Sequence, residues 1–142
     1  MWEEGKGPDF VLEVASPGSW REDVGPKRSV YARLGVREYF LYDPTGEHLT
    51  PRLQGNRLDD GVYERLSAVE SIDRTLAMRS EVLGLELRAK GGGEMRFHDP
   101  ATGQTLLSHS EEHAAWRAVL VRAEAAEARV AELEALLGGK GR

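Results

Sequence analysis

The chain has 142 residues, of which 40% are hydrophobic and 30% charged, and this length suffices for one compact domain with an appendage. The formal net charge of −5 argues against a non-specific nucleic-acid binder, and the lack of cysteine excludes disulfides and thiolate metal sites. No apolar run approaches the roughly 18 residues of a membrane span, and the first residues lack signal-peptide order, so we expect a cytoplasmic protein with no membrane partner.

The first predicted element is a strand over residues 10–15, in the stretch PDFVLEVASP. Side chains two apart on a strand share a face, so one face is apolar and Asp9 and Glu13 lie on the other. Two carboxylates beside small apolar neighbours are costly to bury unless a cation lies between them. Three explanations for the two carboxylates remain open: a metal ion between them, a lysine between them, or an exposed face that is simply solvated by water.

A short helix over residues 24–34 follows the turn cluster after this strand. Asp23 is its predicted N-cap, Pro26 falls in its first turn and Gly35 provides a left-handed stop. Residues 38–42 then form a buried hydrophobic strand. Strand, helix and strand in this order favour a right-handed crossover between parallel strands, and so a mixed α/β sheet.

The middle of the chain is predicted to contain β-hairpins. Asp-Asp-Gly in RLDDGVYERL (57–66) is a hairpin signal, residues 83–87 form an alternating strand, and EMRFHDPATGQTLL (94–107) forms another hairpin. We accordingly divide the chain into a domain over 1–90, a hairpin and linker over 91–109, and a C-terminal helix over 110–137.

The C-terminal helix carries apolar side chains at alternating spacings of three and four, which is a heptad seam. The seam consists of Trp116, Val119, Ala123, Ala126, Val130, Leu133 and Leu137. Such a helix pairs with a second copy, pairs with another chain or folds back on its own domain. Alanine buries little area, so a homodimer through Trp116–Leu137 would be weak.

Asp9, Glu13 and Lys27 are the candidate catalytic residues. Hydrolysis of a phosphodiester requires a divalent metal held by carboxylates, and a lysine can stabilise the negative charge that develops. Carboxylates suit Mg²⁺, so Glu13 and Asp9 are the candidate metal ligands. The alternative is that both acids and the lysine are simply solvated.

An ordered run of motifs resembles the Uma-two family of restriction endonucleases, a branch of the PD-(D/E)xK nuclease superfamily. The matching residues are Pro8-Asp9, Glu13-Val14, Ser16-Pro17, Asp23, Lys27, Tyr31, Gly35-Val36, Glu38-Tyr39 and Asp43-Pro44. The pieces PRLQGNRL, SEVLGLEL and MRFHDPATGQTLL also resemble one branch of this family.

The resemblance implies a DNA endonuclease that depends on Mg²⁺ or Mn²⁺, with an α/β/α core of restriction-endonuclease type. Glu13 would be the acid of the (D/E)xK element. Ala15 stands where the lysine of that element is expected, and Lys27 on the following helix matches the family in its place, since a long side chain can reach the site from there. Asp9 would line the same pocket.

The chain also departs from the family, whose members carry a further N-terminal region with another Pro-Asp. This sequence starts with Met1-Trp2-Glu3-Glu4 just before its Pro8-Asp9, so we expect a partial restriction-endonuclease-like sheet with half of the site. The alternative function is a catalytically inactive remnant or a protein-interaction module that acts through the C-terminal helix.

Overall fold

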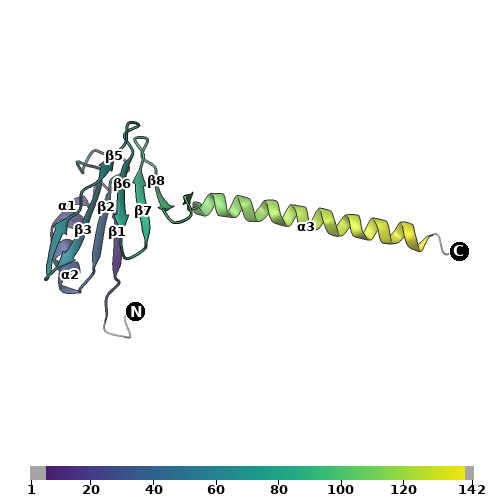
Figure 1. The fold of residues 1–142 in the computed structure, drawn as a ribbon, viewed down its shortest axis with the longest axis horizontal. Helices are drawn as coiled ribbons and strands as arrows, with labels where there is room; N and C mark the ends of the chain where they lie inside the picture. The colour runs from purple at the N-terminus through teal and green to yellow at the C-terminus, as the bar shows by residue number, and fades with distance from the viewer. Residues whose placement is uncertain (1–5, 140–142) are drawn as a thin grey trace. The chain divides into compact units, whose positions relative to one another are not determined.

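The computed structural model describes residues 6–139, which divide into two compact units, one up to Leu106 and one from Leu107 onward. The first unit contains β1 (Phe10–Val14), α1 (Trp20–Val24), α2 (Pro26–Arg33), β2 (Glu38–Tyr42), β3 (Leu53–Asp59), β4 (Val62–Arg65), β5 (Val69–Glu70), β6 (Leu76–Ser80), β7 (Leu85–Ala89), β8 (Met95–Asp99) and β9 (Gln104–Thr105) (Figure 1). The second contains helix α3 (His109–Gly138). The Trp2-Glu3-Glu4 stretch lies outside the described residues. Among residues 6–139 no helix is long and apolar enough to cross a membrane.

A four-stranded mixed sheet in the order β1-β2-β3-β4 positions the helices. β1 runs parallel to β2, and the other two pairings are antiparallel. Every residue of β2 is buried, as expected for a central strand covered on both faces. The predicted strand–helix–strand unit with parallel strands is therefore confirmed.

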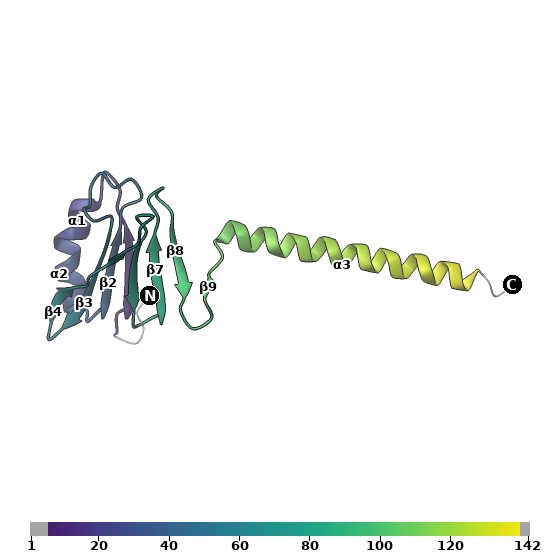
Figure 2. The same ribbon diagram turned by 45° about the horizontal axis from the view of Figure 1, so that its top comes forward.

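The two faces of this sheet pack against different layers (Figure 2). Alternation along β2 sends Phe40 toward the second sheet, where it joins a core with Met78 and Leu87. Tyr39 points the opposite way and packs with Tyr31 of the helical layer. The second sheet is antiparallel, in the order β5-β6-β7-β8-β9. The α/β class is confirmed, but in the described residues this sheet stands where the resemblance implied a second helical layer.

The first helical region differs from its prediction. Two helices, α1 and α2, meet at Gly25, whose backbone (φ −116°, ψ −97°) is not helical. Pro26 explains the break, because proline disfavours helical backbone in the residue before it. Asp23 lies inside α1, so its predicted role as an N-cap is wrong. Gly35 has a φ of +72°, and the predicted left-handed stop is confirmed.

The predicted hairpins are confirmed, but one predicted strand begins too early. β3 and β4 are joined by Asp60 and Gly61, which both have positive φ, as a tight two-residue hairpin turn requires. β8 and β9 form the later hairpin. The strand predicted over 83–87 is β7, which starts at Leu85, because Gly84 (φ +66°) belongs to the preceding turn.

The segment predicted as a hairpin and linker continues the second sheet. β8 pairs with β7, and the first compact unit extends to Leu106. The turn at the start of this segment is held in place, because Arg52 donates hydrogen bonds of 3.2 Å to the carbonyls of Lys90 and Gly91.

Helix α3 begins with a complete capping box. The Ser108 hydroxyl accepts a hydrogen bond from the Glu111 backbone, and the Glu111 carboxylate accepts one from the Ser108 backbone. All residues from His109 to Gly139 are exposed. The predicted helix over 110–137 is confirmed, while its pairing stays a prediction.

Asp43, directly after β2, is fully buried and anchors the following loop. Its carboxylate accepts hydrogen bonds from the backbone of Thr45, His48 and Leu49 at 3.0, 2.7 and 2.9 Å. Burial alone would raise the pKa of Asp43, but these hydrogen bonds outweigh it and hold the pKa well below its usual range. The ionised carboxylate therefore stabilises the fold above its unfolded pKa of about 4, and this stability is lost as the pH falls.

We predict that Asp43→Asn lowers the free energy of unfolding at pH 7 by about 1–3 kcal/mol, because an amide group would face backbone donors. Urea denaturation from pH 7 to pH 3 measures this, and the variant should lose less stability on acidification than the parent chain. Asp60→Asn, in the exposed turn, is the control and should change stability by less than about 0.5 kcal/mol. Equal stability of the Asp43 variant and the parent would contradict the role of the loop anchor.

Candidate functional site

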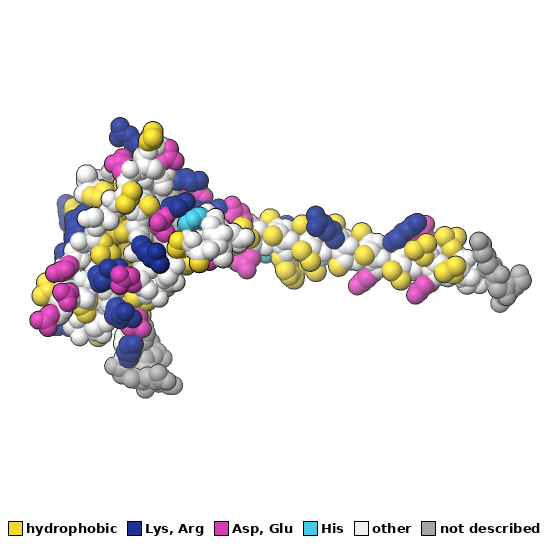
Figure 3. All heavy atoms as spheres, in the orientation of Figure 1, with side chains coloured by type: hydrophobic (Ala, Val, Ile, Leu, Met, Phe, Trp, Pro, Cys, Tyr) yellow, Lys and Arg dark blue, Asp and Glu magenta, His cyan; other side chains and the backbone are white. Residues whose placement is uncertain are grey.

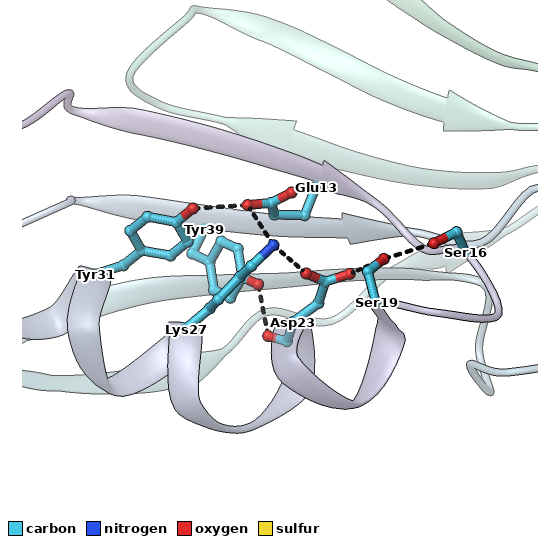
Figure 4. Close-up of polar contacts among 7 residues, drawn as sticks. All are labelled: Glu13, Ser16, Ser19, Asp23, Lys27, Tyr31 and Tyr39. Atoms are coloured by element: carbon cyan, nitrogen blue, oxygen red, sulfur yellow. Dashed lines mark hydrogen bonds and ion pairs between the residues drawn. The ribbon is translucent and has the colours of Figure 1, made fainter.

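The candidate site lies where β1 faces the two short helices (Figure 4). Glu13, near the end of β1, is paired in register with Leu41 of β2. After β1 a tight turn reverses the chain, with the backbone of Ser19 and Trp20 bonded to the carbonyl of Ser16. This turn leads directly into α1 and brings Asp23 close to Glu13.

Lys27, at the start of α2, bridges the two carboxylates. Its Nζ lies 3.3 Å from Glu13 Oε1 and 2.8 Å from Asp23 Oδ1. The structure therefore brings together Glu13 and Lys27, two of the three residues selected from the sequence, although they are 14 positions apart. Of the three explanations left open for the acid on this strand, a lysine is the one found beside Glu13.

Asp23 is the buried member of the site, with none of its surface exposed. Its other oxygen, Oδ2, accepts a hydrogen bond of 3.2 Å from the Ser19 hydroxyl, which contacts the Ser16 hydroxyl at 2.8 Å. Tyr39 of β2 donates a hydrogen bond of 2.5 Å to the Asp23 backbone carbonyl. These contacts fix the carboxylate that holds the lysine.

Tyr31, one turn after Lys27 on α2, fixes Glu13 from the other side. Its hydroxyl donates a hydrogen bond of 2.6 Å to Glu13 Oε1. Burial first, and then the hydrogen bond to Glu13, raise the pKa of Tyr31, so the phenol remains a donor. Oε1 thus receives both Tyr31 and Lys27, whereas Oε2 accepts no hydrogen bond within residues 6–139 (Figure 4).

The charge of Lys27 is permanent at physiological pH. The hydrogen bond to Asp23 raises its pKa to about 12, against the opposing effect of partial burial and with further help from Glu13. A lysine with this pKa is protonated at neutral pH and carries a positive charge. About a third of its side chain, and a quarter of that of Glu13, is exposed, so the pair is accessible to a ligand.

Asp9 is not part of this cluster. It precedes β1 by one residue, and its carboxylate pairs with Lys6 at 3.0 Å. Residues four apart along an extended strand are separated by about 13 Å. One metal ion cannot bind both the Asp9 and the Glu13 carboxylate across this distance in an extended strand. Asp9 Oδ1, the oxygen in the ion pair with Lys6, is buried, and Lys6 donates its hydrogen bond of 3.1 Å to Oδ2. A role for Asp9 in metal binding stays a prediction.

Sequence reasoning did not select Asp23 or Tyr31 as site residues. The spacing of four between Asp23 and Lys27 is a signal for an ion pair along a helix, but the same aspartate also fits a helix cap. Tyr31 lies a further four residues along, on the same face of α2.

The donor set is compatible with a hard divalent cation but does not form a cage for it. No cluster of three or more metal-binding side chains occurs among the described residues. Mg²⁺ is commonly held by one or two carboxylates, with waters and substrate phosphates completing its shell. Glu13 Oε2 offers one such ligand, whereas both oxygens of Asp23 already have partners.

A layered α/β domain with a carboxylate–lysine pair between its first strand and the flanking helix is consistent with the restriction-endonuclease-like class of folds. The model of the Uma2 (Uma-two) family, described as "Putative restriction endonuclease", matches residues 2–90. This is more than half of the 142 residues, and the chain belongs to the Uma2 family. No match is found among curated proteins.

We predict that Lys27→Met lowers the free energy of unfolding by about 1–2 kcal/mol, because the buried Asp23 carboxylate loses its cation. Solvent screening at the partly exposed lysine keeps the loss below that of a fully buried pair. Lys90→Met, which breaks the exposed pair with Glu94, is the matched control and should cost less than about 0.5 kcal/mol. Chemical denaturation compares the three chains, and equal losses in both variants would contradict a structural role for the bridge.

Proposed function

We propose that the chain is a metal-dependent DNA endonuclease that hydrolyses phosphodiester bonds. Membership of the Uma2 family, whose description is "Putative restriction endonuclease", supports DNA as the substrate. The observation that carries the proposal is the position of the Lys27 ammonium beside Glu13, whose second oxygen accepts no hydrogen bond from the described residues. A fixed cation next to an available carboxylate suits an anionic substrate whose charge grows in the transition state. A DNA substrate also agrees with the cytoplasmic location predicted from the sequence.

Glu13 would hold the metal, Mg²⁺ or Mn²⁺, through Oε2. When bound, such an ion polarises the phosphate and lowers the pKa of a coordinated water. Tyr31 and Lys27 hold Oε1 and so orient the carboxylate. The metal shell needs no second carboxylate from this chain if waters and phosphate oxygens complete it.

Lys27 acts in this proposal as a positive charge and not as a base. Its raised pKa keeps it protonated, so it attracts the phosphate and stabilises the developing negative charge. Asp23 is a positioning residue, because its buried carboxylate fixes the ammonium next to Glu13.

Cleavage of duplex DNA in the presence of Mg²⁺ or Mn²⁺ tests this function. We expect Glu13→Gln and Lys27→Met each to slow cleavage on the order of 100-fold or more, as for the loss of one stabilising group in the transition state. Glu64→Gln, an exposed carboxylate on β4, is the control and should leave the rate unchanged. Cleavage that persists in Glu13→Gln, or after chelation of the metal, would contradict the proposal.

The second candidate function is a protein-interaction module that acts through α3, without catalysis. The observation that favours it is the full exposure of this helix, including Trp116, Val130 and Leu133, which are 60%, 53% and 43% exposed. Apolar side chains in such a row are typical of a partner-binding surface, and a second copy of the chain is the predicted partner.

We predict that the double substitution Val130→Asp with Leu133→Asp abolishes association, because it introduces charge into the seam. Val121→Asp, on the same helix but outside the seam, is the matched control and should associate normally, as should Glu13→Gln. Sedimentation velocity reads out the result. If both helix variants associate like the parent, the seam is not the interaction surface.

A further inference from the structure

We propose that α3 pairs with α3 of a second copy as a parallel, in-register, two-stranded coiled coil. This inference deepens the interaction role proposed for the helix and does not depend on nuclease activity. The argument rests on the apolar seam, on the charges that flank it and on the exposure of both.

The seam assigns Trp116, Ala123, Val130 and Leu137 to heptad position a, and Val119, Ala126 and Leu133 to position d. All seven are exposed, and apolar surface continues along the helix (Figure 3). Its strongest heptad combines a β-branched residue at a with leucine at d, the combination that favours two parallel strands.

The charges beside the seam select the orientation. With this register, Arg122 and Arg129 occupy position g, while Glu127 and Glu134 occupy position e. In a parallel pair, position g lies next to position e of the following heptad in the other helix. Arg122 would pair with the partner's Glu127, and Arg129 with the partner's Glu134. By the two-fold symmetry of the dimer, each of these ion pairs would form twice.

An antiparallel pair would be unfavourable. It places g beside g and e beside e, so arginines would face arginines and glutamates would face glutamates. The charges of one α3 helix therefore complement those of a second α3 helix only in the parallel orientation. A second copy of the chain is the occupant that these charges fit.

The charged side chains that flank the seam can form these intermolecular ion pairs. Arg129 forms an ion pair of 2.6 Å with Glu132 on its own helix, but both side chains are about 60% exposed. Arg122, Glu127 and Glu134 have no ion pair within residues 6–139. Exposed pairs of this kind are weak, so Arg129 can exchange its partner at little cost.

The seam is short, and its centre is weak. It spans about 33 Å at 1.5 Å per residue, and Ala123 and Ala126 at its centre bury little area. We therefore expect a dimer whose fraction depends on protein concentration.

A charge-reversal experiment on the full chain tests partner and register. Arg122→Glu with Arg129→Glu makes both flanks acidic, and Glu127→Arg with Glu134→Arg makes both basic. We expect each variant alone to dissociate roughly tenfold or more readily than the parent, since like charges now face each other. An equal mixture should recover the parent's dimer fraction in sedimentation equilibrium. A monomeric parent at every concentration, or variants that dimerise as well alone as mixed, would overturn the inference.

Engineered cysteines test the orientation, because the chain has none of its own. With Leu137→Cys, a parallel in-register pair brings the two thiols together, and we expect a disulfide-linked dimer under mild oxidation. In an antiparallel pair the same residues lie at opposite ends of the seam. Ala128→Cys, at outward position f, is the control and should stay unlinked. A dimer that forms no disulfide with Leu137→Cys would overturn the parallel orientation, although the helix would still self-associate. A monomer whose α3 binds a different protein would overturn the homodimer and leave only the general interaction role.

Discussion

One ion pair network determines the geometry of the candidate site. The Lys27 ammonium joins Glu13 on β1 to Asp23 on α1, while its own backbone belongs to α2. The ion pairs thereby connect β1, α1 and α2. Loss of the lysine would leave the Asp23 carboxylate buried without a cation, which lowers the free energy of unfolding. Glu13 Oε1 consequently contacts Lys27 and Tyr31, whereas Oε2 accepts no hydrogen bond from the described residues, and the proposed metal-binding role rests on this difference.

The rest of the first unit holds the residues of this ion pair network in position. The fully buried β2 supplies Tyr39, which bonds to the backbone of Asp23 and packs against Tyr31. The second sheet covers the opposite face of β2 and leaves the helix-facing side of β1 to the site. Helix α3 belongs to a separate unit, and no residue of this helix is buried. The proposed catalytic role and the proposed association role therefore rest on different residues, and substitutions can test them separately.

Local signals in the sequence were sufficient for some elements. Turn chemistry at Asp60-Gly61 and the left-handed Gly35 are dictated by backbone sterics, which act within a few residues. Asp23 shows the limit, because an aspartate before a proline-started helix fits a cap and an ion pair equally well. The structure shows the ion pair, because Asp23 lies within α1 and its carboxylate contacts Lys27 of α2. The hydrogen bond from Tyr31 to Glu13 and the second sheet likewise depend on contacts between distant segments, which periodicity does not encode.

Divalent-ion binding at Glu13 is the central claim of this account, and calorimetry tests it most directly. Mg²⁺ and Mn²⁺ are titrated into the purified chain and, in parallel, into Glu13→Gln. The account predicts binding with a dissociation constant of about millimolar or tighter in the parent chain and none in the variant. Equal binding in both chains would move the metal to other ligands. No binding in either would contradict a working metal site in this chain.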